Sequence, residues 1–149
     1  MKYFGREGLT WSLIAPRLYA RHLPQGYILD SGAPCAFLRQ GIPHDELFFI
    51  MGWALTDLCN RILKEVLNHT RNIQSKDFER LPYPSWVDGG RKEKAVELVK
   101  GLIALARSGQ ELSFGSPEVR CLNDVYAWRD GALAELQRKS AGLRQMALF

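Results

Sequence analysis

The side chains of this sequence best suited to chemistry are Arg71, Asn72, Gln74 and Lys76, which stand in one short run. Asparagine and glutamine can form two hydrogen bonds to the edge of adenine, and arginine can do so with guanine. Arginine and lysine also bind phosphate oxygens. The run therefore indicates a surface for nucleic acid, with Arg71 and Lys76 as phosphate contacts. A structural alternative stays open, since Asn72 and Gln74 could instead satisfy main-chain groups of a loop.

A second group of such residues, Arg17, Tyr19 and Arg21, lies in the N-terminal segment that also contains Trp11. The arginines could bind phosphates or guanine edges, and the aromatic rings could stack on bases. The alternative is that Trp11 and Tyr19 belong to the core while the arginines are solvated or form salt bridges. We include Arg17, Tyr19 and Arg21 among the predicted DNA contacts.

A long helix is expected to support the first group. Apolar residues recur at helical spacing through residues 47–67, and the pattern predicts a helix that is buried on all sides in its first half. Asn68 and Thr70 mark its end. Its core positions are predicted at Leu47, Met51, Leu55, Leu58 and Ile62.

The connector after this helix has its own local signals. Residues 71–75 have the character of a short polar strand. Ser75 is predicted to cap a single helical turn through residues 78–80, because its hydroxyl can accept a bond from an unpaired amide. Pro82 and Pro84 then enforce an extended segment.

The rest of the chain divides into a β-rich part and a helical part. Residues 2–41 are predicted to hold short strands, each bounded by glycine or proline, at 10–14, 26–32 and 35–38. Helices are predicted at residues 91–107 and from Pro117 through Leu136. The sequence thus predicts an α+β fold, with a β-rich N-terminal third followed by about three helices and a short helical turn.

Several runs of the chain, taken in order, carry a resemblance to a known family. They are residues 3–12, residues 19–34, Thr70-Arg71-Asn72-Ile73-Gln74 and Leu81-Pro82-Tyr83-Pro84. Together they resemble the C-terminal target-recognition region of adenine-N6 DNA methyltransferases of the single-chain restriction–modification type, a group that includes the BREX phage-defence methyltransferases. Arg21 matches the family pattern, which makes it the favoured contact of its group. The chain departs from the pattern at His69, where proline is usual, and at Ile73, where an aromatic residue is common.

The resemblance implies a function that this chain performs only as part of a larger enzyme. The family transfers a methyl group from S-adenosylmethionine to adenine, and it needs an Asn/Asp-Pro-Pro-Tyr/Phe loop to hold the flipped base. Leu81-Pro82-Tyr83-Pro84 has neither the Asn or Asp nor the paired prolines, and no glycine-rich cofactor loop is present. We therefore expect a recognition fragment that is inactive alone, with cofactor and catalytic residues in a methyltransferase domain of the same polypeptide.

Composition excludes several other classes. The chain has 149 residues, of which 46% are hydrophobic and 24% charged, as in an ordinary globular protein. No apolar run reaches the roughly 18 residues of a membrane span, and no signal peptide opens the sequence, so a cytoplasmic protein is expected. Three widely spaced cysteines and three histidines lack metal-ligand spacing, which predicts reduced cysteines and no metal site. The net charge of +4 is compatible with a polyanionic partner.

Other candidate groups have plainer interpretations. The basic residues from Arg91 to Lys94, together with Lys100, are favoured as a solvated helix face over a phosphate site. Trp86 and Trp128 are favoured as packing residues, and the acidic pairs have no nucleophile to assist. We expect one domain or domain fragment over residues 1–149, with a recognition core at 1–84 and a helical part at 85–149. The alternative function is a scaffolding module whose helices dock on another subunit.

Overall fold

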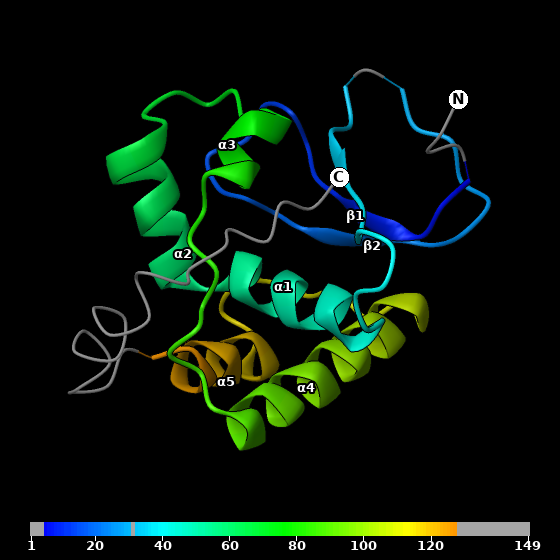
Figure 1. Ribbon diagram of the computed structural model, residues 1–149, viewed down its shortest axis with the longest axis vertical. Coiled ribbons are helices and arrows are strands. Elements are labelled where there is room, and N and C mark those ends of the chain that lie inside the picture. The colour runs from blue at the N-terminus through cyan, green and yellow to red at the C-terminus, as the bar shows by residue number, and fades with distance from the viewer. Residues whose placement is uncertain (1–4, 31, 128–149) are drawn as a thin grey trace.

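The computed structural model of the protein describes residues 5–30 and 32–127, and it confirms the α+β class (Figure 1). A small antiparallel sheet comes first, in the order β2-β1-β3, and is formed by β1 (Gly8–Thr10), β2 (Arg21–Leu23) and β3 (Cys35–Ala36). The helical elements that follow are α1 (Asp45–Leu55), α2 (Asp57–Arg61), the π-helix η1 (Ile62–Leu67), α3 (Ser75–Glu79), α4 (Gly89–Arg107) and α5 (Pro117–Val125).

The predicted strands are only partly correct. The strand predicted at 35–38 is confirmed at its first two residues, and that at 10–14 overlaps the sheet only at Thr10. The strand predicted at 26–32 is wrong, since β2 lies just before Pro24 and no strand follows it in the described part of that run. Gly26 has a φ of +92°, which turns the chain, and the next two apolar side chains are exposed. The hydrophobicity of these two residues therefore does not indicate a buried strand.

The predicted helix at 47–67 is interrupted at Thr56. This residue is extended (ψ 154°), and its hydroxyl oxygen accepts a hydrogen bond from the Cys59 amide at 3.2 Å. The interruption shifts the buried face by one residue, so that Cys59 and Leu63 are fully buried while the predicted Leu58 and Ile62 are only half-buried. Of the other predicted core positions, Leu47 and Met51 are buried and Leu55 is half-buried.

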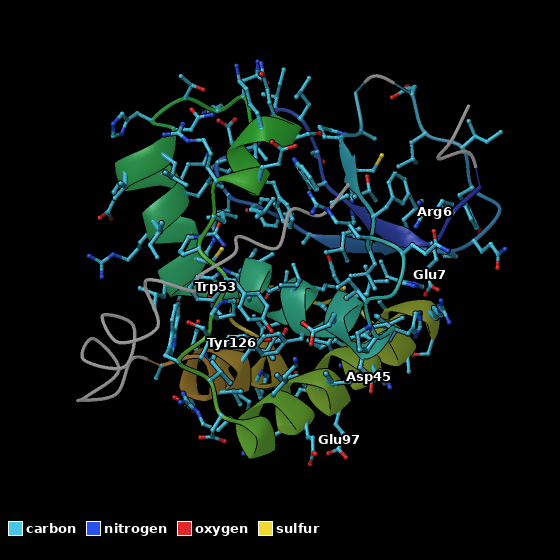
Figure 2. All side chains as sticks on the ribbon, in the orientation of Figure 1. Arg6, Glu7, Asp45, Trp53, Glu97 and Tyr126 are labelled. Atoms are coloured by element: carbon cyan, nitrogen blue, oxygen red, sulfur yellow. The ribbon has the colours of Figure 1, made fainter. Side chains whose placement is uncertain are left out.

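Helix α1 is the centre of the molecule, between the sheet on one side and α4 and α5 on the other (Figure 1). Its residues 46–54 are all buried, which confirms the predicted all-round burial. Gly52 lets the helices approach closely, because a Cβ atom there would lie 2.7 Å from the Tyr126 hydroxyl oxygen. That hydroxyl donates to the Phe49 carbonyl at 2.5 Å, and Trp53 packs edge-on against Trp86 (Figure 2).

The prediction of a solvated helix face for the basic residues of α4 is only partly correct, because Lys92 and Lys100 form ion pairs within the fold. Lys92 pairs with the buried Glu46, to which the Tyr83 hydroxyl donates at 3.1 Å. Burial lowers the pKa of the Lys92 ammonium. Lys100 pairs with Asp45 at 2.8 Å. These ion pairs fasten α4 to α1 and leave Lys92 and Lys100 engaged within the fold.

Helix boundaries follow their caps. Helix α4 begins at Gly89, two residues before the predicted start, because the Asp88 carboxylate accepts from the Arg91 amide at 2.9 Å. Helix α5 starts at Pro117 as predicted and ends at Val125. The prediction of an unbroken helix through Leu136 is wrong at Tyr126 and Ala127, which follow the end of α5. Residues 128–136, including Trp128, lie outside the described residues.

The predicted cap of the short helical turn is wrong. Ser75 is the first residue of α3, and Gln74 occupies the capping position before it. The Asp77 carboxylate accepts a hydrogen bond from the Gln74 amide at 2.9 Å. An acidic residue in the first turn thus accepts the main-chain hydrogen bond that was predicted for the serine hydroxyl.

Candidate nucleic-acid interface

The residues Arg71, Asn72, Gln74 and Lys76 lie in a connector that we call the polar loop (residues 68–76). Its main chain is bonded to the N-terminal segment: Ile73 donates to the Leu13 carbonyl at 2.7 Å. The Trp11 indole donates to the Ile73 carbonyl at 3.0 Å, and both of these side chains are fully buried. The loop is thus anchored at residue 73, while the four polar side chains around it are exposed, as recognition would require.

Asn68 organises the polar loop, and sequence reasoning missed this role. Its amide nitrogen donates to the Asn72 carbonyl and to the Asp77 carboxylate, each at 2.8 Å. Its side-chain oxygen accepts from the amide and the hydroxyl of Thr70, at 2.8 and 2.7 Å. The signal was present in the sequence, because an asparagine two residues before a threonine at a helix end is typical of an Asx turn.

This geometry bears on the structural alternative for Asn72. Asn68 supplies the loop with main-chain hydrogen bonds of the kind that the alternative assigned to Asn72, whereas Gln74 itself takes part in the capping box of α3 with Asp77. Among the described residues, the Asn72 side chain forms no hydrogen bond, and it is exposed beside Arg71. It is therefore available to a partner in a way that Asn68 is not.

Lys64 supports the same loop from below. Its ammonium donates to the Thr70 carbonyl at 2.8 Å and to the Ala15 carbonyl at 3.3 Å, which ties the loop to the N-terminal segment a second time. Burial lowers the pKa of this ammonium; Arg71 lowers it further, and Asp77 opposes both. The positive charge of the Lys64 ammonium adds to the electrostatic potential beneath the exposed loop.

The predicted N-terminal group lines a second feature, the β2–α4 groove, a cavity of about 1090 Å³ between β2, α4 and residues 112–119. Arg17 is already engaged: it pairs with Asp57 at 2.5 Å, and its guanidinium carbon lies 3.8 Å from the centre of the Phe114 ring. Tyr19 is partly exposed and meets Phe114 edge-on. Arg21 is exposed, and among the residues that the structure describes it donates only to the Ser12 hydroxyl, at 3.3 Å. Arg21 is therefore freer than Arg17 to bind a phosphate.

The two groups adjoin each other through the N-terminal segment. Ser12 holds Arg21, and Ile14, two residues later, is paired with Asn72 across an antiparallel bridge. From the reach of the chain and the bridge spacing, the Arg21 guanidinium lies within roughly 20 Å of Asn72. At 3.4 Å per base pair, about six pairs of B-DNA cover that length. One duplex is long enough to touch both groups.

Other chemistries find little support in the described part of the chain. No group of three or more His, Cys, Asp or Glu side chains there is close enough to hold a metal ion. Cys35, Cys59 and Cys121 are free thiols, and burial raises the pKa of both Cys35 and Cys59. Within residues 5–30 and 32–127, no helix combines the length and hydropathy needed to cross a membrane.

The chain matches no model of a known protein family and no curated protein. The resemblance to methyltransferase recognition regions therefore stays a prediction.

Proposed function

We propose that this chain is the DNA target-recognition region of an adenine-specific DNA methyltransferase. The observation that carries the proposal is the polar loop, whose main chain is fixed at Ile73 while Arg71, Asn72, Gln74 and Lys76 are exposed. A rigid base with exposed amide and guanidinium groups is what reading of base edges requires.

The roles of the residues follow from their chemistry. Arg71, Lys76 and Arg21 bind phosphates and position the duplex, while Asn72 and Gln74 approach the base edges. Methyl transfer from S-adenosylmethionine belongs to a methyltransferase domain of the parent polypeptide, so this chain alone binds DNA without modifying it. The proposed location is the cytoplasm, because the protein must be in the same compartment as the DNA that it binds.

Fluorescence anisotropy with a labelled duplex across a salt series tests the proposal. We expect non-specific binding with a Kd on the order of 10⁻⁴–10⁻⁶ M that weakens as salt rises, because each neutralised phosphate releases counterions. Replacing both Arg21 and Arg71 with alanine should flatten the log–log salt slope by roughly 1.8, or about 0.9 per lost phosphate contact.

The matched control is the double variant Arg39→Ala/Arg120→Ala, which removes the same charge from exposed positions outside the polar loop and the groove. It should change the salt slope much less. Equal slopes for the two double variants, with both folds intact by circular dichroism, would reduce the binding to net charge and contradict the proposal.

A second candidate function is a protein-interaction module. The observation that favours it is the β2–α4 groove, whose lining is mostly apolar and open. The outer surface of a DNA duplex is phosphate and sugar, which does not complement an apolar groove lining.

A further inference from the structure

The β2–α4 groove combines an apolar floor with a basic rim. Aliphatic side chains from α1, α4 and α5 form the floor: Met51, Leu55, Leu102, Ile103, Ala106 and Val119. The rim carries the guanidinium groups of Arg17, Arg21 and Arg107, and no carboxylate lies among the described residues that line the cavity. Such a surface complements a ligand that has apolar side chains and negative charge.

Two of these arginines have no acidic partner within the described chain. Arg107 donates to Nδ1 of His22 at 3.2 Å, and Arg21 donates to the Ser12 hydroxyl. A guanidinium can only donate, so His22 accepts at Nδ1 and donates from Nε2 to the Glu7 carboxylate at 2.6 Å. Arg107 is thus held in place by a neutral ring, with its charge uncompensated at the mouth of the groove.

The groove also runs along an unpaired strand edge. β2 is one of the two edge strands of the sheet. Main-chain groups alternate between the two sides of a strand, and the Trp11 amide, just beyond β1, donates to Pro34 on the β3 side. Thr10 therefore faces β2, opposite Arg21. By the same alternation, the N–H and C=O of the next residue, His22, point away from β1 to the free edge.

Ala20 extends this edge by one more pair of groups. Within the described residues, neither its N–H nor its C=O takes part in a main-chain hydrogen bond. Ala20, which is 4% exposed, and the half-buried His22 both line the groove, as do the exposed rings of Tyr19 and Tyr27. The free main-chain donors and acceptors, the apolar floor and the basic rim of the groove therefore all lie along the edge of β2.

We propose that the β2–α4 groove binds an extended acidic peptide segment of a partner protein, which adds a strand to the free edge of β2. A strand placed 4.7–4.9 Å from β2 would bond Ala20 and His22, and alternate side chains would enter the apolar floor. Acidic side chains of the segment would pair with Arg21 and Arg107. The aliphatic floor offers few polar groups to a nucleobase, which favours a peptide over a nucleotide. This proposal does not rest on DNA binding by the polar loop.

The test uses the full chain and a fluorescein-labelled heptapeptide in which valine alternates with glutamate. We expect saturable anisotropy below about 1 mM peptide, the weak end of specific binding. A peptide with lysine for glutamate should not bind. A peptide with the same sequence but N-methylated at alternate amides should bind about tenfold more weakly, because it cannot donate to the strand edge.

A pair of neighbouring variants locates the site. Tyr27→Ser changes an exposed ring that lines the groove, and Ile28→Ser changes an equally exposed side chain outside it. We expect Tyr27→Ser to weaken peptide binding at least about threefold and Ile28→Ser to leave it unchanged. Arg107→Gln should weaken it as well and reduce its dependence on salt.

Three results would overturn the proposal. One is the absence of saturable binding by the acidic peptide. Another is equal affinity for the N-methylated and unmodified peptides. The third is binding of a single-stranded oligonucleotide that Tyr27→Ser weakens while peptide binding stays unchanged, since the groove would then be a nucleic-acid surface.

Discussion

The region around α1 and the polar loop are both ordered, but different forces hold them in place. Around α1, apolar surfaces fit so closely that one added methyl group at Gly52 would clash with Tyr126. In the polar loop, by contrast, order comes from hydrogen bonds to main-chain groups, several of them made by Asn68 and Lys64. The exposed side chains of Arg71 and Asn72 contribute little to this order.

The difference shows where this molecule can vary. In the core, stability depends on shape, so most positions are constrained by their neighbours. In the polar loop, stability depends on a few buried or half-buried anchors, so the exposed positions can change without loss of structure. A recognition surface needs this separation, because its specificity can then change while its frame is kept.

The largest expected effect is in the core, at the position where the helix interruption at Thr56 changes which residue is buried. Leu63→Ala should lower the free energy of unfolding by about 2–5 kcal/mol, because Leu63 is fully buried and its loss leaves a cavity. Leu58→Ala, at a half-buried position, should cost clearly less. Urea denaturation of both variants checks this. A larger loss for Leu58 would show that the buried face continues without the shift at Thr56.

The next effect separates a close-packed glycine from an ordinary one. Gly52→Ala should destabilise by about 1–3 kcal/mol through overpacking against Tyr126 and Val99. Gly101→Ala, in α4 with no atom within 4 Å of the added Cβ, should instead stabilise by roughly 0.5–1 kcal/mol through helix propensity. Thermal denaturation gives both signs. The contrast between core and loop would weaken if Gly52→Ala were neutral.

In the polar loop, the expected losses are smaller and confined to the anchor. Asn68→Ala should cost about 1–2 kcal/mol, because it leaves the Asn72 carbonyl and the Asp77 carboxylate short of a donor. Asn72→Ala should change stability by less than about 0.5 kcal/mol, since its side chain is exposed. Denaturant melts of the pair measure this. If Asn72 proved the costlier loss, the loop would depend on its exposed residues after all.

The smallest effect concerns Glu7, which lies between the sheet and the start of α1 (Figure 2). Its carboxylate meets His22 at 2.6 Å and His44 at 2.8 Å. Burial alone would raise the pKa of Glu7, but the hydrogen bonds from His22 and His44 lower it below its ordinary 4.5. The charged form is thus favoured by folding.

The sign of the pH dependence follows. A lowered carboxyl pKa stabilises the folded state above the unfolded value of 4.5, and this contribution is lost as the pH falls through the folded pKa. Glu7→Gln should remove that part of the acid dependence and cost at most about 1 kcal/mol at neutral pH, because the site is partly exposed. Stability curves from pH 3 to 7 test it, and parallel curves for variant and wild type would contradict it.

The sequence revealed the fold class, α4 and the start of α5 because local signals agreed with the tertiary structure there. Pro117 at the first helical position marks the start of α5, and apolar residues at helical spacing mark α4. The all-round burial of α1 was also visible, because every face at its start is apolar.

What the sequence concealed depended on contacts between distant residues. Thr56 interrupts the helix because its hydroxyl and main chain are satisfied in a buried site, a choice that the apolar periodicity cannot show. The exposed run after Gly26 resembles a strand by composition, yet no strand among the described residues pairs with it. At the candidate site, residue types indicated Arg71 and Asn72, but the engagement of Arg17 by Asp57 appears only in three dimensions.

The bond from the Trp11 indole to the Ile73 carbonyl joins residues that are 62 positions apart in the chain. Closing a flexible chain of that length costs about 4 kcal/mol in entropy, before any contact compensates for it. Helical turns within α1 and α4 need no such closure, so they can form while the N-terminal segment is still free. The bonds that anchor the polar loop at Ile73 can therefore form only after residues 11–15 return to the loop. The surface proposed to recognise DNA thus depends on a long-range closure that the helical turns do not need.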